Sequence, residues 1–215
     1  MIEINAASDI VLRNKERPKR YSTTLGLLAH ELGHVLYTDF LGSQVYANKM
    51  SSGAWHPRQP VLPSPKHTGN CADMMAFVTK DEYHVRAFFL EAHHIHNILE
   101  DGFVNAMMID KYPGSLGVCL EELYVGIADI LPTVPECMER EDDENGHVWR
   151  TISQLMISYV VCGIIKYDGV PKSDPRIRAV FDVVNELDHG AENISAEERW
   201  DIVNAIMAAL HTHRA

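Results

Sequence analysis

The sequence predicts a mainly α-helical protein with at most a minimal strand at its N-terminus. Apolar residues recur every three or four positions over several long segments, whereas clear alternation of apolar and polar residues is confined to residues 2–5. The 215 residues, 46% hydrophobic and 23% charged, have the composition of one globular domain. A chain of this length buries enough surface to fold without a structural metal. We therefore expect a single domain over residues 1–215, either complete or a fragment of a longer chain.

The first expected helix covers residues 22–40, with Ser22 or Thr23 as its N-cap. Residues 51–70 contain four prolines and two glycines, which predicts a long loop. The longest helix is expected over residues 80–110, before Pro113.

The second half of the chain continues the helical pattern. We expect helices over residues 118–131 and 148–167, with a solvated acidic loop over 136–145 between them. Asp174 and the proline after it predict the start of another helix. Ser195 begins a capping-box pattern for the last helix, to about residue 211.

Composition and charge exclude several classes of function. The net charge of −11 disfavours nucleic acid and anionic membranes as partners. The four cysteines form no C-x-x-C pair, which is typical of reduced thiols in a cytosolic protein. We find neither a secretory signal nor a segment able to span a bilayer. We therefore expect a cytoplasmic protein that binds neither nucleic acid nor membrane.

One motif carries chemistry, the segment His30-Glu31-Leu-Gly33-His34. On an α-helix, residues four apart project from the same face, so His30 and His34 can direct their imidazoles at one metal ion. Glu31 lies beside them and can act as general base on a water at that metal, as in other H-E-x-x-H sequences. Neutral imidazole suits Zn²⁺, which lowers the pKa of its bound water to about 7. Gly33 would permit close packing against this helix.

Two histidines do not complete such a site, because catalytic zinc takes three protein ligands and a water. Phe40 stands where an extended motif would place a third histidine. The longest helix offers two candidates in the segment His96-Asn-Ile-Leu-Glu100-Asp101. A carboxylate from Glu100 would give a His₂Glu set, and His96 is the alternative ligand.

The combination of H-E-L-G-H and N-I-L-E-D resembles the metallopeptidase domains of bacteria and phages that are often encoded in front of a von Willebrand A domain and near MoxR-type ATPases. The resemblance covers residues 1–40 and 93–108. It implies a zincin-like fold of the gluzincin type, zinc bound by His30, His34 and Glu100, and Asp101 as a carboxylate behind the ligands. It also implies a protein or peptide substrate, and a von Willebrand A domain or MoxR-type ATPase as partner.

The sequence thus predicts a zinc-dependent metallopeptidase that hydrolyses peptide bonds with Glu31 as general base. Tyr112, Tyr124 and His147 are candidates, by residue type alone, for a group that stabilises the oxyanion.

Two alternatives remain at this point. The first is a non-catalytic zinc-binding scaffold that partners a von Willebrand A domain or an AAA+ ATPase. The second is a phage-type regulatory metallopeptidase that cleaves repressors, which the segment Ala29-His-Glu-Leu-Gly-His34 also resembles. Such a regulator should come with a DNA-binding helix-turn-helix, and we see no basic recognition helix in the sequence.

Overall fold

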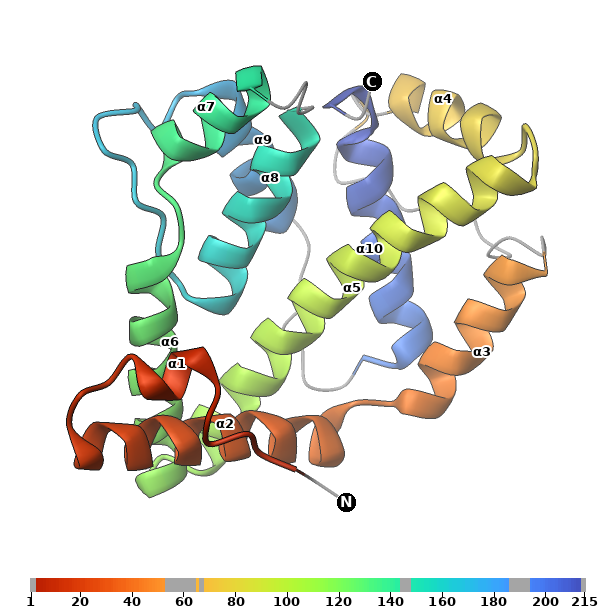
Figure 1. Ribbon diagram of the computed structural model, residues 1–215. Coiled ribbons are helices and arrows are strands. Elements are labelled where there is room, and N and C mark those ends of the chain that lie inside the picture. The colour runs from red at the N-terminus through yellow and green to blue at the C-terminus, as the bar shows by residue number, and fades with distance from the viewer. Residues whose placement is uncertain (1–2, 53–64, 66–67, 144–147, 186–193, 214–215) are drawn as a thin grey trace.

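The structure is a computed structural model, which describes residues 3–52, 65, 68–143, 148–185 and 194–213. These residues form helices and no strand, so the mainly α prediction is confirmed (Figure 1). The strand expected at residues 2–5 is absent from residues 3–5, which are irregular. A single short strand with no partner strand has nothing to accept its backbone hydrogen bonds, and alternation in four residues is too weak a signal to override this.

The helices are, in chain order, α1 (Asp9–Leu12), α2 (Arg17–Tyr37), α3 (Phe40–Ser51), α4 (Thr68–Val78), α5 (Glu82–Lys111), α6 (Ser115–Ile130), α7 (Val134–Asp143), α8 (Val148–Met156), the π-helix η2 (Ile157–Val161), α9 (Pro175–Val184), α10 (Ala196–Ala209) and the 3₁₀ turn η3 (His211–His213).

Helix α5 runs through the middle of the molecule (Figure 1). Its first half packs with α4, α8, α9 and α10 around the larger hydrophobic core, which includes Phe88, Ile95 and Trp200. Its second half packs with α2 and α6 around a smaller core, which includes Ala29, Met108 and Leu120. Residues near position 100 of α5 therefore lie where the two cores meet.

Helix α2 begins five residues before the expected cap, at Arg17, with Pro18 in its first turn, where a proline fits without loss of a hydrogen bond. Its most buried face is a line of small residues, Gly26, Ala29 and Gly33. A Cβ on Gly33 would lie 2.9 Å from Cγ of Met108, which confirms the close packing expected there. The apolar periodicity thus predicted that this segment is a helix but did not predict which of its faces is buried.

Several later elements follow the predictions. Helix α5 agrees with the expected range within two residues. The Asp174 side chain caps α9 by accepting a hydrogen bond from the backbone of Arg176. Ser195 and Glu198 form the predicted capping box of α10.

Other elements differ from the predictions. The acidic stretch begins as helix α7, since Val134 and Cys137 are buried and hold its apolar side against the neighbouring α8. The helix expected over 148–167 ends earlier and changes to the π-helix η2, which packs on α5 where Gly102 leaves room for Val160. Most of the loop expected over 51–70 lies outside the described residues.

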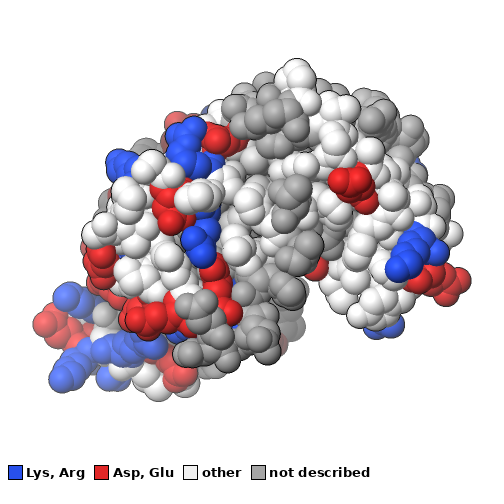
Figure 2. Space-filling model, turned by 90° about the horizontal axis from the view of Figure 1, so that it is seen from above, with Lys and Arg blue, Asp and Glu red and all other residues white. Residues whose placement is uncertain are grey.

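The charged side chains form no single-signed surface on the described part of the face shown in Figure 2. Lys and Arg side chains there are interspersed with Asp and Glu side chains. Within the described ranges, none of the helices combines the length and the apolar character needed to cross a bilayer.

Candidate metal centre

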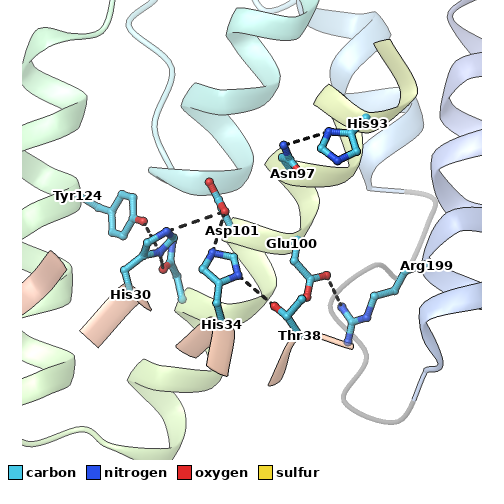
Figure 3. A network of polar contacts seen from close by, with 10 residues as sticks. His30, His34, Thr38, His93, Asn97, Glu100, Asp101, Tyr124 and Arg199 are labelled. Atoms are coloured by element: carbon cyan, nitrogen blue, oxygen red, sulfur yellow. Dashed lines mark hydrogen bonds and ion pairs between the residues drawn. The ribbon is translucent and has the colours of Figure 1, made fainter. Parts of the chain in front are cut away.

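Three side chains from two helices converge where α2 crosses α5 (Figure 3). His30 and His34 project from one face of α2, and Asp101 projects toward them from α5. Oδ1 of Asp101 lies 3.2 Å from Nε2 of His34 and 3.9 Å from Nε2 of His30. One ligand atom from each residue lies within 4.8 Å of the others. Bonds of about 2.0–2.1 Å from a tetrahedral zinc would separate two such atoms by about 3.3 Å, so this group has the spacing of a metal site.

The other ring nitrogen of each histidine is held by a polar neighbour. Nδ1 of His30 lies 2.9 Å from Oδ1 of Asn105 and 2.9 Å from the hydroxyl of Tyr124. Nδ1 of His34 lies 3.0 Å from the hydroxyl of Thr38. The amide oxygen of Asn105 can accept a proton carried on Nδ1 of His30, and in that tautomer the Nε2 lone pair is free to bind a metal ion. Partners of this kind orient the histidines of metal sites.

The electrostatics of the cluster follow from its geometry. The hydrogen bond with Asp101 raises the pKa of His34 above its ordinary value, although partial burial opposes the shift. The negative charges of Glu100 and Glu31 act in the same direction. Two imidazoles and a carboxylate thus form a group that could hold a metal ion.

Asp101 is the carboxylate of the cluster, whereas the third ligand expected from the sequence was Glu100. Consecutive residues on a helix point about 100° apart, so only one of the two carboxylates can face the histidines of α2 directly. The Glu100 side chain is buried, with 6% of the residue exposed, and extends toward Arg199 of α10, whose Nη1 is 3.9 Å from its Oε2 (Figure 3). Glu100 still lies close enough to influence the pKa of His34. The geometry therefore favours Asp101 over Glu100 as the third ligand.

His96, the alternative ligand, is not part of the cluster. Its ring stacks on the indole of Trp200, with centroids 4.1 Å apart and planes inclined by 17°. Burial is the main reason that the pKa of His96 falls to about 4, so the ring is neutral at pH 7. His96 thus packs at the edge of the larger hydrophobic core, against Trp200.

Glu31, the candidate general base, is exposed on α2 next to His30. It is near enough to raise the pKa values of His34 and Tyr124 by its charge. The side chain of Asp101 is 37% exposed, and those of His30 and His34 are 16% and 21% exposed. The cluster therefore borders solvent.

Asn105 and Thr38 were not expected from the sequence as partners of the histidines, and Tyr124 was expected in another role, as a candidate for stabilising the oxyanion. The structure places the Tyr124 hydroxyl on His30, where burial raises the pKa of the phenol and keeps it protonated. Asn105 follows Asp101 by one helical turn, a spacing that could have indicated a second polar residue on the same face. Tyr112 ends α5 away from the cluster, and His147 lies outside the described residues.

The donor set fits zinc, because imidazole nitrogens and a carboxylate oxygen are its usual ligands and solvent access leaves room for a water. Neither the known family models, nor the curated proteins, nor the solved structures contain a match to this chain.

Proposed function

We propose that this protein is a zinc-dependent peptidase in which His30, His34 and Asp101 hold the metal and Glu31 is the general base. The observation that carries the proposal is the convergence of two Nε2 atoms and Oδ1 of Asp101, with Nδ1 of each histidine occupied by another partner. The H-E-x-x-H spacing supports it independently, because a purely structural metal site has no need of the glutamate.

Zinc at this site would supply an acidic water and a Lewis acid for a peptide carbonyl. Glu31 would take the proton that the attacking water loses and deliver it to the leaving nitrogen. Asn105, Tyr124 and Thr38 would hold the two imidazoles in one orientation throughout, which spares the site a reorganisation during the reaction. These three residues would be positioning residues that do not touch the substrate.

The experiment combines metal analysis with a peptidase assay on four proteins: wild type, Glu31→Gln, His34→Ala and the control Glu121→Gln. Glu121 is exposed on α6 and is not a member of the cluster, so its variant removes one surface carboxylate from another helix. We expect about one zinc per chain in all except His34→Ala. Peptide hydrolysis should be present in wild type and Glu121→Gln and fall by at least about 100-fold in Glu31→Gln.

Three outcomes would contradict the proposal. Absence of zinc from metal-replete wild type would remove the metal site itself. Hydrolysis that Glu31→Gln does not reduce would exclude Glu31 as the general base. Stoichiometric zinc with no hydrolysis of a peptide library would leave a zinc-binding scaffold. A von Willebrand A domain or MoxR-type ATPase would then be the first partner to test by co-purification.

A further inference from the structure

A cleft of about 310 Å³ opens directly beside the candidate metal centre. His34 and Asp101 line one end of it, Phe40 of α3 contributes to one wall, and Glu100 of α5 contributes to another. Trp200 reaches the cleft from α10. Its volume is at the lower end of the range for ligand sites, which suits one side chain of a bound peptide.

Among the described residues, two carboxylates line this cleft, Glu100 and Asp101, together with three histidines, His34, His93 and His96. If Asp101 binds the metal, Glu100 is the carboxylate left to meet a ligand. His96 also lines the cleft and is uncharged at pH 7. Glu100 thus brings a carboxylate to the wall of the cleft, beside the candidate metal centre.

The carboxylate of Glu100 has unused hydrogen-bonding capacity. Its one partner among the described residues is Nη1 of Arg199 at 3.9 Å, which is longer than a charge-assisted hydrogen bond of 2.7–2.9 Å. The Arg199 guanidinium instead lies over the ring of Phe103, 3.4 Å from its centroid, and lines other cavities rather than this cleft. An ionised carboxylate can accept about four hydrogen bonds, and burial makes unfilled sites costly.

We propose, building on the peptidase function above, that this cleft binds a cationic nitrogen group of the substrate through Glu100. The group is the side chain of a lysine or arginine next to the cleaved bond, or a free N-terminal ammonium. Either one carries several N–H donors and the opposite charge.

The aromatic lining of the cleft suits the rest of such a side chain. Phe40, which lines the cleft from α3, is 62% exposed and presents an apolar ring surface, whereas Trp200 is 1% exposed and stacks against Tyr46 and His96. Long cationic side chains lay their methylene groups along apolar surfaces while the charged end meets a polar group. A neutral aliphatic side chain would gain the same contact but leave Glu100 unsatisfied.

The test uses peptides with acetylated N-termini and amidated C-termini that differ at one position: lysine, norleucine or glutamate. Norleucine retains the four carbons of lysine and lacks its charge. A fourth peptide, with norleucine and a free N-terminus, separates the N-terminal ammonium from the side chain. Binding to the zinc-loaded Glu31→Gln protein is measured by fluorescence anisotropy, and cleavage is measured with wild type.

We expect the lysine peptide, or the peptide with the free N-terminus, to bind at least about tenfold more tightly than blocked norleucine, since hydrogen bonds to charged groups are stronger than those between neutral groups. Glutamate should bind most weakly. Glu100→Gln should reduce the ratio of cationic to norleucine affinity toward one, and Glu121→Gln should leave it unchanged. If Glu100→Gln is poorly folded, Glu100→Gln combined with Arg199→Met removes both charges and should give the same ratio.

Equal affinities for lysine, norleucine and the free N-terminus in the Glu31→Gln protein would overturn the inference, and so would a ratio that survives the loss of Glu100. The binding assay does not depend on hydrolysis. If the cationic preference is found without cleavage by wild type, the inference holds and the peptidase function fails. If cleavage occurs with no preference, the function holds and the inference fails.

Discussion

Oδ1 of Asp101 lies 3.2 Å from Nε2 of His34, although the two residues belong to different helices. The same two helices form a second contact one turn away, between Nδ1 of His30 and Oδ1 of Asn105. Each helix thus contributes a pair of residues at i and i+4 to the cluster, His30 and His34 from α2, Asp101 and Asn105 from α5. This reciprocal arrangement fixes the crossing of the helices and the orientation of the imidazoles together.

Because Asp101 and not Glu100 faces the histidines, substitutions of these two carboxylates should differ in their effect on zinc affinity. Asp101→Asn should weaken zinc binding by at least about 100-fold, because it removes a charged ligand from the cluster. Glu100→Gln should weaken it by less than about tenfold, because that side chain extends toward Arg199. Competition with a chelating dye measures both affinities, and a larger loss in Glu100→Gln would restore Glu100 as the ligand.

The partners of His30 should tune the metal site without touching the metal. Asn105→Ala removes the acceptor of the Nδ1 proton and should lower zinc affinity by about 10–100-fold. Tyr124→Phe should lower it in the same direction. Tyr112→Phe removes a hydroxyl from the exposed end of α5 and is the matched control. Zinc titration with the same dye measures these affinities. Wild-type affinity in both Asn105→Ala and Tyr124→Phe would contradict the role given to these two residues.

Two glycines test the close approach of α2 to α6. A Cβ on Gly26 would lie 2.4 Å from the backbone oxygen of Cys119, so Gly26→Ala requires the helices to separate and should cost about 1–3 kcal/mol. Gly126 lies within α6 and has open space where a Cβ would be. Gly126→Ala should therefore stabilise the protein by about 0.5–1 kcal/mol. Urea unfolding gives both values, and equal effects at the two sites would contradict the packing described.

His96 should make stability depend on pH. Its pKa is about 4 in the folded protein, mainly because it is buried, with the positive charges of His93 and Arg199 lowering it further and Asp101 opposing them. In the unfolded chain a histidine titrates near 6.5. Between these values the unfolded state binds more protons, so the free energy of unfolding falls as the pH drops from about 6.5 to 4. The total contribution is about 3 kcal/mol.

Unfolding of His96→Phe across this pH range isolates that contribution, since phenylalanine retains the stack on Trp200 and does not titrate. The variant should lose less stability at low pH than wild type. His94→Phe, at an exposed position of the same helix, is the control and should retain the acid dependence of wild type. A His96→Phe curve parallel to wild type would show that His96 is not held uncharged in the fold.

The sequence determined the local features of this protein. Its apolar periodicity and capping residues gave α5, α9 and α10, because these signals act over one or two helical turns. The spacing of His30 and His34 put both imidazoles on one face of α2 for the same reason.

The tertiary structure decided which groups meet those imidazoles. Glu100 and Asp101 are neighbours on one helix, and only the rotation of α5 against α2 selects between them. That rotation depends on close packing at Gly33, where α2 meets Val104 and Met108 of α5. A glycine adds nothing to the apolar periodicity, so this contact could not be predicted from the pattern. Helical spacing is a local property of the chain, whereas the orientation of one helix on another follows from the shapes of both surfaces.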